Sequence, residues 1–183
     1  MTAVTALSIR PCKHEDIPTV VELVQWAYRG GKPSNRQWTG EAHLVKGPRI
    51  TPEKLSALLD APKDVIVLLC ERSNEQGAQQ IVGCVQCDKK GQDAHVGMLA
   101  VDPDQQSAGI GRVLMQAADD WARTKYGATR MVAEVITGRP ELMSWYQRQG
   151  YSATGETAPF FGPEHGVTPL VEGLHFKIIA KPL

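Results

Sequence analysis

Hydrophobic and polar residues alternate along the chain with two periods, one typical of strands and the other of helices. The segment 4–10 alternates apolar and polar positions, which predicts a first strand. Apolar residues follow at helical spacing over 17–27, after the acidic segment 14–16, and Gly30 is expected to end this helix. A short second helix is predicted over 52–60, because proline is well tolerated in the first turn of a helix.

The rest of the chain carries the apolar strands of a sheet. Residues 65–70 are continuously apolar, which is typical of a strand covered on both faces. The further predicted elements are strands at 81–87 and 93–101 joined by a hairpin loop at 89–91, a strong helix over 109–126, a strand over 131–136, a helix over 140–148, and strands from Tyr151 onward and at 174–179. This order predicts a mixed α/β sheet rather than a regular βαβ series.

The length and charge of the chain narrow the class of protein. With 183 residues the chain can form one domain with a hydrophobic core, and we expect a single domain over residues 1–183. Hydrophobic residues (42%) and charged residues (22%) are close to globular averages, which excludes disordered and fibrous classes. Since 20 basic residues balance 20 acidic ones, we expect no nucleic-acid partner held by bulk charge.

No segment predicts a membrane span or an export signal. The longest apolar run, 65–70, is far shorter than the roughly 20 residues that a membrane helix needs. Residues 1–10 lack a basic region followed by an apolar stretch. We therefore expect a soluble, cytoplasmic protein with no membrane partner and with its four cysteines reduced.

The cysteines do not predict a metal site. Cys84 and Cys87 have the spacing of a zinc half-site, but the chain contains no second pair of this kind. Residues three apart on a strand point to opposite faces, so we do not expect these two to share a ligand. No cluster of histidines or carboxylates indicates a metal, and we expect none.

A strand, a turn and the start of a helix follow one another in the stretch 99–112, LAVDPDQQSAGIGR. Glycines let a backbone approach a ligand closely, and the free N–H groups at a helix start point at an anion. Either a cradle for a diphosphate or a plain tight turn fits this spacing. A P-loop is excluded because Arg112 and Val113 replace the required Lys and Ser/Thr, and a dinucleotide fingerprint is excluded because Leu114 stands at its third glycine.

Two motifs in this chain resemble those of the GNAT acetyltransferase superfamily. The first runs from Gln106 to Gly111 and matches the pattern Gln/Arg-x-x-Gly-x-Gly/Ala that follows a strand. The second, LMSWYQRQGY at 142–151, is similar to a helix that carries a tyrosine and leads into a Gly-Phe/Tyr strand start. The resemblance implies an α/β fold of the GNAT type: a mixed, mostly antiparallel central sheet, splayed between its fourth and fifth strands and flanked by about four helices.

The resemblance also implies acetyl-CoA as the co-substrate. The diphosphate is then expected on the turn and helix start, and the pantetheine arm along the preceding strand. The residues implied in binding it are Leu99, Ala100, Val101, Gln106, Ser107, Ala108, Gly109, Ile110, Gly111, Arg112, Arg139 and Tyr146. Arg139 departs from the family pattern, which often has asparagine there, so its contact with pantetheine is in doubt and a phosphate or a substrate carboxylate is an alternative partner.

Three residues are candidates for the proton transfers of an acetyl transfer. His95 lies on the predicted strand 93–101, where related enzymes often carry the base, and period-2 alternation predicts that it shares a face with Gly97 and Leu99. Glu134 on the neighbouring strand is a second candidate base. Tyr146 matches the family tyrosine near the coenzyme sulfur. Because a thiol is a stronger acid than a phenol, Tyr146 is expected to stabilise the leaving thiolate by a hydrogen bond rather than give up its proton fully.

The acceptor site is expected beside segment 30–52, which has no clean periodicity and is typical of a binding loop. Trp38, Glu41 and His43 in this segment are suited to a cationic amine, with Tyr28 as a further wall of the site. Arg36 and Arg49 could alternatively hold a carboxylate, which would indicate an amino acid. An ordinary surface loop is the remaining interpretation.

The sequence favours an acetyl-CoA-dependent N-acetyltransferase that acts on a primary amine of a small molecule, such as an amino acid, a polyamine or a xenobiotic amine, by direct attack in a ternary complex. One alternative is an enzyme that acetylates the N-terminus or a lysine of a peptide or protein. Another is a non-catalytic sensor that binds acyl-CoA and needs neither His95 nor Tyr146. The protein is expected to be a monomer or a homodimer.

Overall fold

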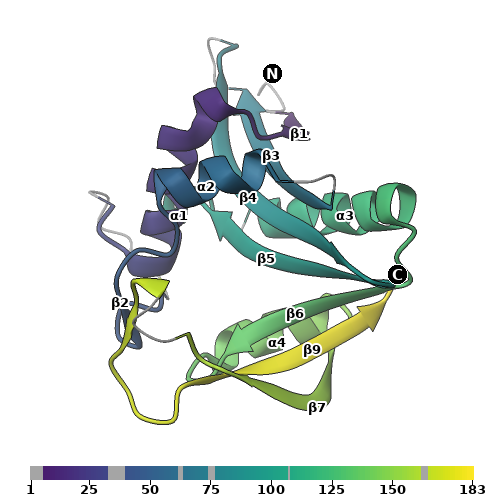
Figure 1. The fold of residues 1–183 in the computed structure, drawn as a ribbon. Coiled ribbons are helices and arrows are strands. Elements are labelled where there is room, and N and C mark those ends of the chain that lie inside the picture. Colours follow the sequence, from purple (N-terminus) through teal and green to yellow (C-terminus); the bar gives the residue numbers. More distant parts are fainter. Residues whose placement is uncertain (1–5, 33–39, 62–63, 74–76, 107, 162–164) are drawn as a thin grey trace.

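The computed structural model describes residues 6–32, 40–61, 64–73, 77–106, 108–161 and 165–183. Its main elements follow the predicted order (Figure 1). The helices are α1 (Ile17–Arg29), α2 (Pro52–Leu59), α3 (Ile110–Trp121) and α4 (Pro140–Arg148). The strands are β1 (Leu7–Pro11), β2 (Val45–Lys46), β3 (Val65–Ser73), β4 (Gln79–Lys90), β5 (Asp93–Val101), β6 (Arg130–Ile136), β7 (Ser152–Pro159), β8 (Thr168–Pro169) and β9 (His175–Pro182).

Seven strands form one sheet that is split in its middle. Their order is β1-β3-β4-β5-β6-β9-β7, and every pair is antiparallel except β5 with β6. These two parallel strands pair only from Asp93 with Arg130 to Val96 with Ala133. Beyond that point they diverge, so the two halves of the sheet meet near the C-terminus and separate toward the other side (Figure 1). The predicted splay of a GNAT-type sheet is confirmed.

Helices cover both faces of the half formed by β1, β3, β4 and β5. The apolar sides of α1 and α2 pack on one face in a cluster that includes Leu55, Leu69 and Met98, while α3 packs on the other face with Leu114 against Leu68. This two-sided cover explains why 65–70 is apolar at every position. Helix α3 continues as a π-helical segment, Ala122–Tyr126, before its C-terminal glycine.

Three local details of the fold differ from the predictions or were not part of them. The predicted hairpin is confirmed, but Lys89 and Lys90 are paired in β4 with the start of β5, so its turn consists of Gly91, at a φ of +63°, and Gln92 rather than of residues 89–91. The last strand, β9, lies between β6 and β7, a position that the order of elements along the chain does not specify. A small antiparallel sheet of β2 and β8 was not predicted, because two-residue strands carry no periodicity.

The two cysteines with the spacing of a zinc half-site lie on opposite faces of the sheet. Cys84 and Cys87 point to opposite faces of β4, as predicted, since their sulfurs approach the carbonyls of Met98 and Ala118 respectively.

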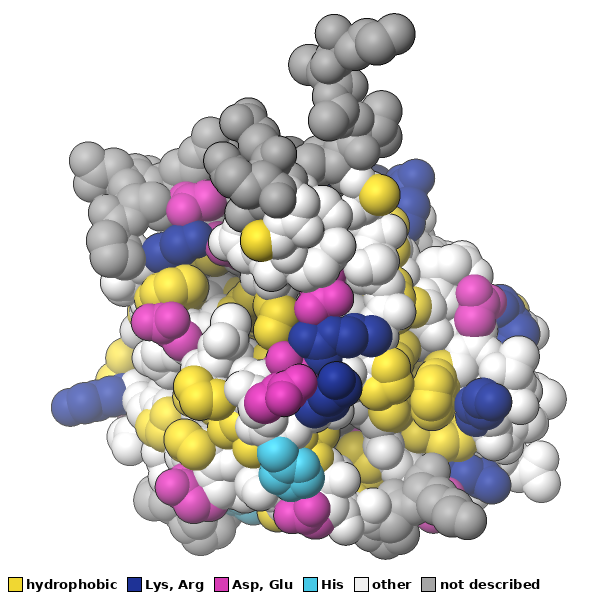
Figure 2. Space-filling model, turned by 90° about the horizontal axis from the view of Figure 1, so that it is seen from above, with side chains coloured by type: hydrophobic (Ala, Val, Ile, Leu, Met, Phe, Trp, Pro, Cys, Tyr) yellow, Lys and Arg dark blue, Asp and Glu magenta, His cyan; other side chains and the backbone are white. Residues whose placement is uncertain are grey.

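Figure 2 shows cationic and anionic side chains interspersed on one face of the molecule. Within the described part of the chain, no helix has the length and apolar character to span a membrane.

Candidate active site

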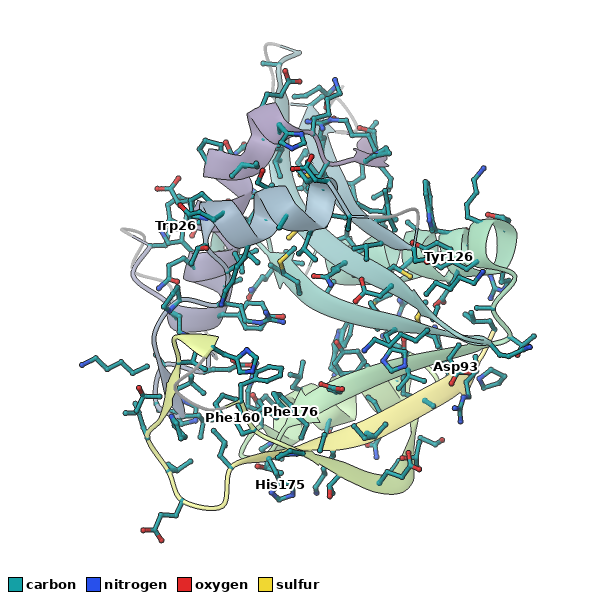
Figure 3. The ribbon with its side chains drawn as sticks, in the orientation of Figure 1. Trp26, Asp93, Tyr126, Phe160, His175 and Phe176 are labelled. Carbon is teal, nitrogen blue, oxygen red and sulfur yellow. The ribbon has the colours of Figure 1, made fainter. Side chains whose placement is uncertain are left out.

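The divergence of β5 and β6 opens a cavity of about 1100 Å³. Its walls come from both halves of the sheet and from α1, α2, α3 and α4. In Figure 3, Asp93 marks the narrow end where the two strands still pair, and Phe160 and Phe176 lie together at the wide end. A cavity open along a strand edge can accept an extended ligand whose polar backbone pairs with that strand.

A β-bulge in β5 shapes the wall of this cavity. Met98 and Leu99 together face the single residue Val85 of β4, and Met98 takes a φ of 47°, which is rare for a residue with a side chain. As a result Met98 packs under α1 and α2 while Leu99 packs toward α3. The prediction that Leu99 shares a face with His95 is therefore wrong, because regular alternation ends at the bulge. His95 and Gly97 do share a face of β5 before the bulge, and both line the cavity, as Leu99 does from beyond the bulge.

The start of α3 forms a glycine-lined wall of the cavity. Gly109, at a φ of +77°, precedes Ile110, and no atom lies within 4 Å of where its Cβ would be. This conformation suits glycine, and the empty space leaves the first N–H groups of α3 open to a ligand. A Cβ at Gly111 would lie 3.2 Å from the ring of Trp145, so α3 and α4 approach closely here.

The turn before Gly109 is held in place by charged and polar contacts. Lys32, beyond the end of α1, pairs with Asp102 and, at 2.8 Å, with Asp104. Asp102 also accepts a hydrogen bond of 3.0 Å from the backbone N–H of Asp104. The side-chain amide of Gln106 donates to the carbonyl of Val101 at 3.4 Å. These contacts fix the chain from the end of β5 to Gln106.

Tyr146 lies on α4 at the side of the cavity opposite α1. Its ring is 7% exposed and makes edge contacts with Trp145 at 5.0 Å and with Tyr151 at 5.2 Å between ring centres. Burial raises the pKa of Tyr146 above the ordinary value of a phenol, and the nearby phenol of Tyr28 adds to the rise. The hydroxyl of Tyr146 therefore stays protonated, which suits a hydrogen-bond donor.

His95 and Glu134 line the cavity from adjacent strands, β5 and β6. Burial lowers the pKa of His95, and the positive charge of Lys90 lowers it further, while Glu134 and Asp93 act in the opposite direction. The net shift is downward, so the imidazole is neutral at neutral pH and can accept a proton. Glu134 is exposed in the opening.

Four charged side chains that line the cavity form an ion-pair cluster. Arg29 contacts Glu41 at 2.9 Å and donates to the carbonyl of Gly47 at 2.7 Å. Arg139 lies 3.7 Å from the other oxygen of Glu41 and 2.9 Å from Glu141. The side chains of Arg29, Glu41 and Arg139 are 10% exposed or less. The cluster therefore links α1, the following loop and the start of α4.

This cluster changes the interpretation of two predicted residues. Glu41 lines the cavity, but its oxygens already face two arginines, so an acceptor ammonium would compete with them. Arg139 likewise lines the cavity while pairing with carboxylates of the protein. The sequence offered no sign that Glu41 pairs with Arg139, because these two residues lie far apart along the chain.

Some of the other predicted residues line the cavity, others lie in the core or on the surface, and three fall in segments that the structure does not describe. Those that line the cavity are Tyr28, Leu99, Val101, Gln106, Ile110 and Arg112. Ala100 is buried under α1 and α2, and Ala108 and His43 are exposed outside the cavity lining. Ser107, Trp38 and Arg36 lie outside the described residues. Phe160, Phe161 and Phe176 also line the cavity, a role that their sequence context did not separate from ordinary packing.

The match to known proteins agrees with this geometry. The family model described as acetyltransferase (GNAT) family matches residues 22–151, which include α3, the β5–β6 opening and α4. The chain belongs to this acetyltransferase family. The predictions of a GNAT-type fold and of an acyltransferase are thereby confirmed at the level of the family. Comparison with curated protein sequences gave no match.

Solved structures of similar fold include GNAT enzymes with different acceptors. A spermidine N-acetyltransferase from Vibrio cholerae in complex with CoA and spermine is 15% identical, with a TM-score of 0.67 over 96% of this chain and 95% of that one. An IAA acetyltransferase from Bacillus cereus is 15% identical, with a TM-score of 0.65 over 97% and 100% of the two chains. The ribosomal-protein-alanine N-acetyltransferase from Escherichia coli is 15% identical, with a TM-score of 0.64 over 97% and 94%. At these identities the likeness concerns the fold.

Proposed function

We propose that this GNAT-family chain transfers the acetyl group of acetyl-CoA to a primary amine of a small molecule, by direct attack in a ternary complex. The observation that carries the proposal is the cavity itself, in which the glycine start of α3, the open edge of β5 and Tyr146 come together. In the reaction the amine nitrogen bonds to the acetyl carbon, the carbon–sulfur bond breaks, and the amine gives up a proton.

The fit of acetyl-CoA is supported by the space at Gly109. A diphosphate at this position would accept hydrogen bonds from the first N–H groups of α3, and the exposed Arg112 would add a charge-assisted contact. The turn from Gln106 through Ser107 and Ala108 would complete the cradle. The pantetheine arm would pair with the edge of β5 from Gly97 to Val101, which β6 leaves unpaired.

His95 is proposed as the base for the amine. Its pKa lies below the ordinary histidine value, so the ring is neutral and can take the proton directly or through water. Glu134 stands across the opening and is the alternative base. The two differ in their environment, because His95 is partly buried at the narrow end whereas Glu134 is exposed.

Tyr146 is proposed to stabilise the leaving thiolate. Its raised pKa makes full proton transfer to sulfur unfavourable, because a thiol near pKa 8.5 is already a stronger acid than an ordinary phenol. A hydrogen bond from the hydroxyl stabilises the developing negative charge without that transfer. The thiolate then takes its proton from solvent.

We place the acceptor at the wide end of the cavity, which we call the acceptor end. The closure of this end favours a small-molecule acceptor. Strands β2 and β8 pair across it, and the N–H of Leu170 donates to the carbonyl of Leu44 at 2.8 Å. Gly47 approaches Gly166 so closely that a Cβ would lie 2.5 Å from its carbonyl oxygen. The loop after α1 is thus joined to the segment before β9, which obstructs the open groove that a protein substrate would need.

The proposal is tested by measuring coenzyme A release from acetyl-CoA by chromatography, against separate pools of amino acids, polyamines, aminosugars, arylalkylamines and short peptides. We expect release above hydrolysis with a pool of small amines. Release with peptides alone would instead support the protein acetyltransferase. Coenzyme binding without release in any pool would support the sensor, and a chain that binds no coenzyme would contradict both.

A further inference from the structure

We propose that the acceptor is an amino acid with an apolar side chain, and that Arg49 binds its carboxylate. This inference rests on the proposed function and names the substrate class of the same cavity. It is carried by the position of one arginine and by the aromatic wall at the wide end of the cavity.

Arg49 lies in the segment of chain between β2 and α2, and its side chain lines the cavity. Its guanidinium lies over the ring of Tyr28, 5.1 Å from the ring centre, and this contact holds the side chain at the cavity wall. Burial raises the pKa values of the phenols of Tyr28 and Tyr146, and the positive charge of Arg49 opposes the rise at both. Arg49 therefore lies within electrostatic reach of the tyrosine proposed to act on the thiolate.

Arg49 has no ion-pair partner within the part of the chain that the structure describes. Among the described residues, no carboxylate lies within ion-pair distance of its guanidinium, whereas the neighbouring cluster of two arginines and two glutamates is neutral as a group. Arginine presents a planar set of donors that matches a carboxylate in two parallel hydrogen bonds. A cation placed this way at the acceptor end fits an anionic group on the acceptor.

The wall at the wide end of the cavity is apolar. Phe160, Phe161 and Phe176 form a cluster with ring centres 5.2 to 5.8 Å apart, and Val167 packs in the same cluster as Phe160 and Phe176. Figure 3 shows Phe160 and Phe176 side by side at this end. Phe161 is 44% exposed, so part of the cluster remains available to cover a ligand. An apolar side chain of the acceptor would be stabilised against these rings.

Together these features discriminate among small amines. A polyamine would bring a second positive charge toward Arg49, which disfavours its binding by like-charge repulsion. An α-amino acid places its carboxylate one carbon from the reacting amine, so Arg49 would both bind it and position the nitrogen. The positive charge beside the amine also favours the uncharged, nucleophilic form of that amine.

The test compares acceptors that differ only in the carboxylate. Phenylalanine is compared with phenethylamine, and ornithine with putrescine, by coenzyme A release and by calorimetric binding to the CoA-loaded protein. We expect phenylalanine to give the highest kcat/KM of the four, with phenethylamine about 10- to 100-fold lower, since a hydrogen-bonded carboxylate–arginine pair is lost.

The variant Arg49→Gln should weaken phenylalanine binding and raise its KM by a similar factor of about 10 to 100, while changing phenethylamine by less than about 3-fold. Arg49→Lys should restore part of the loss. Arg123→Gln, on the exposed π-helical segment after α3, serves as the control and should match the unmodified protein. Thermal unfolding and CoA affinity show whether each variant keeps its fold.

Two results would overturn the inference and leave the acetyltransferase proposal standing. One is acetylation of phenethylamine as efficient as that of phenylalanine, with neither affected by Arg49→Gln. The other is a preference for putrescine over ornithine. Failure of all four amines both to bind and to react would also overturn it, and CoA binding measured in the same experiment would show separately whether the coenzyme site exists.

Discussion

His95 and Tyr146 have pKa shifts that suit opposite parts in one reaction. Burial in the cavity wall lowers the pKa of the imidazole and raises that of the phenol, because burial disfavours the charged form of each group. The histidine is thereby kept neutral and able to accept a proton, and the tyrosine is kept protonated and able to donate a hydrogen bond. Neither shift can be derived from the sequence, which shows the residue types but not their burial.

The base is tested by replacing His95 with alanine. We expect kcat to fall about 100-fold at a pH above the pKa of His95, with a smaller loss at lower pH, where the imidazole of the unmodified protein is itself protonated, and no change in CoA affinity. The unmodified protein should lose activity as the pH falls through the pKa of His95, below the ordinary value of about 6.5, because the imidazole then becomes protonated. This inflection should be absent from the pH–rate profile of the variant.

Glu134→Gln is the matched comparison for that experiment. If His95 is the base, this variant keeps the low-pH inflection and most of the rate. A variant at Glu134 that loses the inflection, beside a His95 variant that keeps it, would reverse the assignment.

Replacing Tyr146 with phenylalanine removes the hydroxyl and keeps the packing of the ring, so it tests the role of the hydroxyl alone. We expect kcat to fall about 10- to 100-fold while CoA affinity stays within about 2-fold, since the hydrogen bond forms chiefly with the leaving thiolate. Because the pKa of Tyr146 is raised, activity should not decline through its ionisation up to about pH 10. Equal loss of affinity and rate would mean that the residue acts only in binding.

At the scale of elements, the proposed coenzyme site depends on the strand β5, the helix α3 and the segment that joins them. The sequence predicted the strand, the glycine-containing turn and the start of the helix, because each of them has a local sequence pattern. It did not predict the bulge at Met98, which depends on the pairing of β5 with β4, nor the contacts of Lys32 that hold the turn. The pairing of Glu41 with Arg139 escaped prediction for the same reason, since it joins residues distant in the chain.

Gly109→Val tests the cradle at the start of α3. The side chain would enter the space proposed for the diphosphate and would strain a backbone at a φ of +77°. We expect the Kd for acetyl-CoA to rise at least about 100-fold in calorimetry.

Gly127→Val provides the control for that strain. Gly127 has a φ of +63°, also has no atom within 4 Å of its Cβ position, and lies at the far end of the same helical stretch. Its variant should lose a similar amount of thermal stability and keep its CoA affinity. Equal loss of affinity in both variants would place the effect in the fold and not in the cradle.

At the scale of the whole molecule, the two halves of the sheet are joined at both ends of the opening. Short parallel pairing of β5 with β6 closes the narrow end, and the pairing of β2 with β8 closes the wide end. The resemblance of the two motifs to the GNAT superfamily implied the first junction. The second was hidden in segment 30–52, whose local sequence contains nothing periodic to mark a two-residue strand.

Gly47→Ala should open the wide end. Its Cβ would lie 2.5 Å from the carbonyl oxygen of Gly166, so the β2–β8 pairing must shift. We expect the acceptor KM to rise about 10-fold with CoA affinity unchanged, because the acceptor wall is displaced and the cradle is not. Gly77→Ala is the control for strain, because Gly77, between β3 and β4 in the chain, has a φ of +79° and no atom within 4 Å of its Cβ position. An unchanged acceptor KM in the Gly47 variant would contradict a role for this junction.

The central claim is that acetyl-CoA binds in the opening between β5 and β6, with its diphosphate on α3. Titration of the ¹⁵N-labelled protein with acetyl-CoA, followed by amide chemical shifts, tests it most directly. We predict the largest shifts at Gly109, Gly111 and Arg112 and along 97–101, and small ones at Gly127 and in β7. Shifts concentrated elsewhere, or none at saturating coenzyme, would contradict the account.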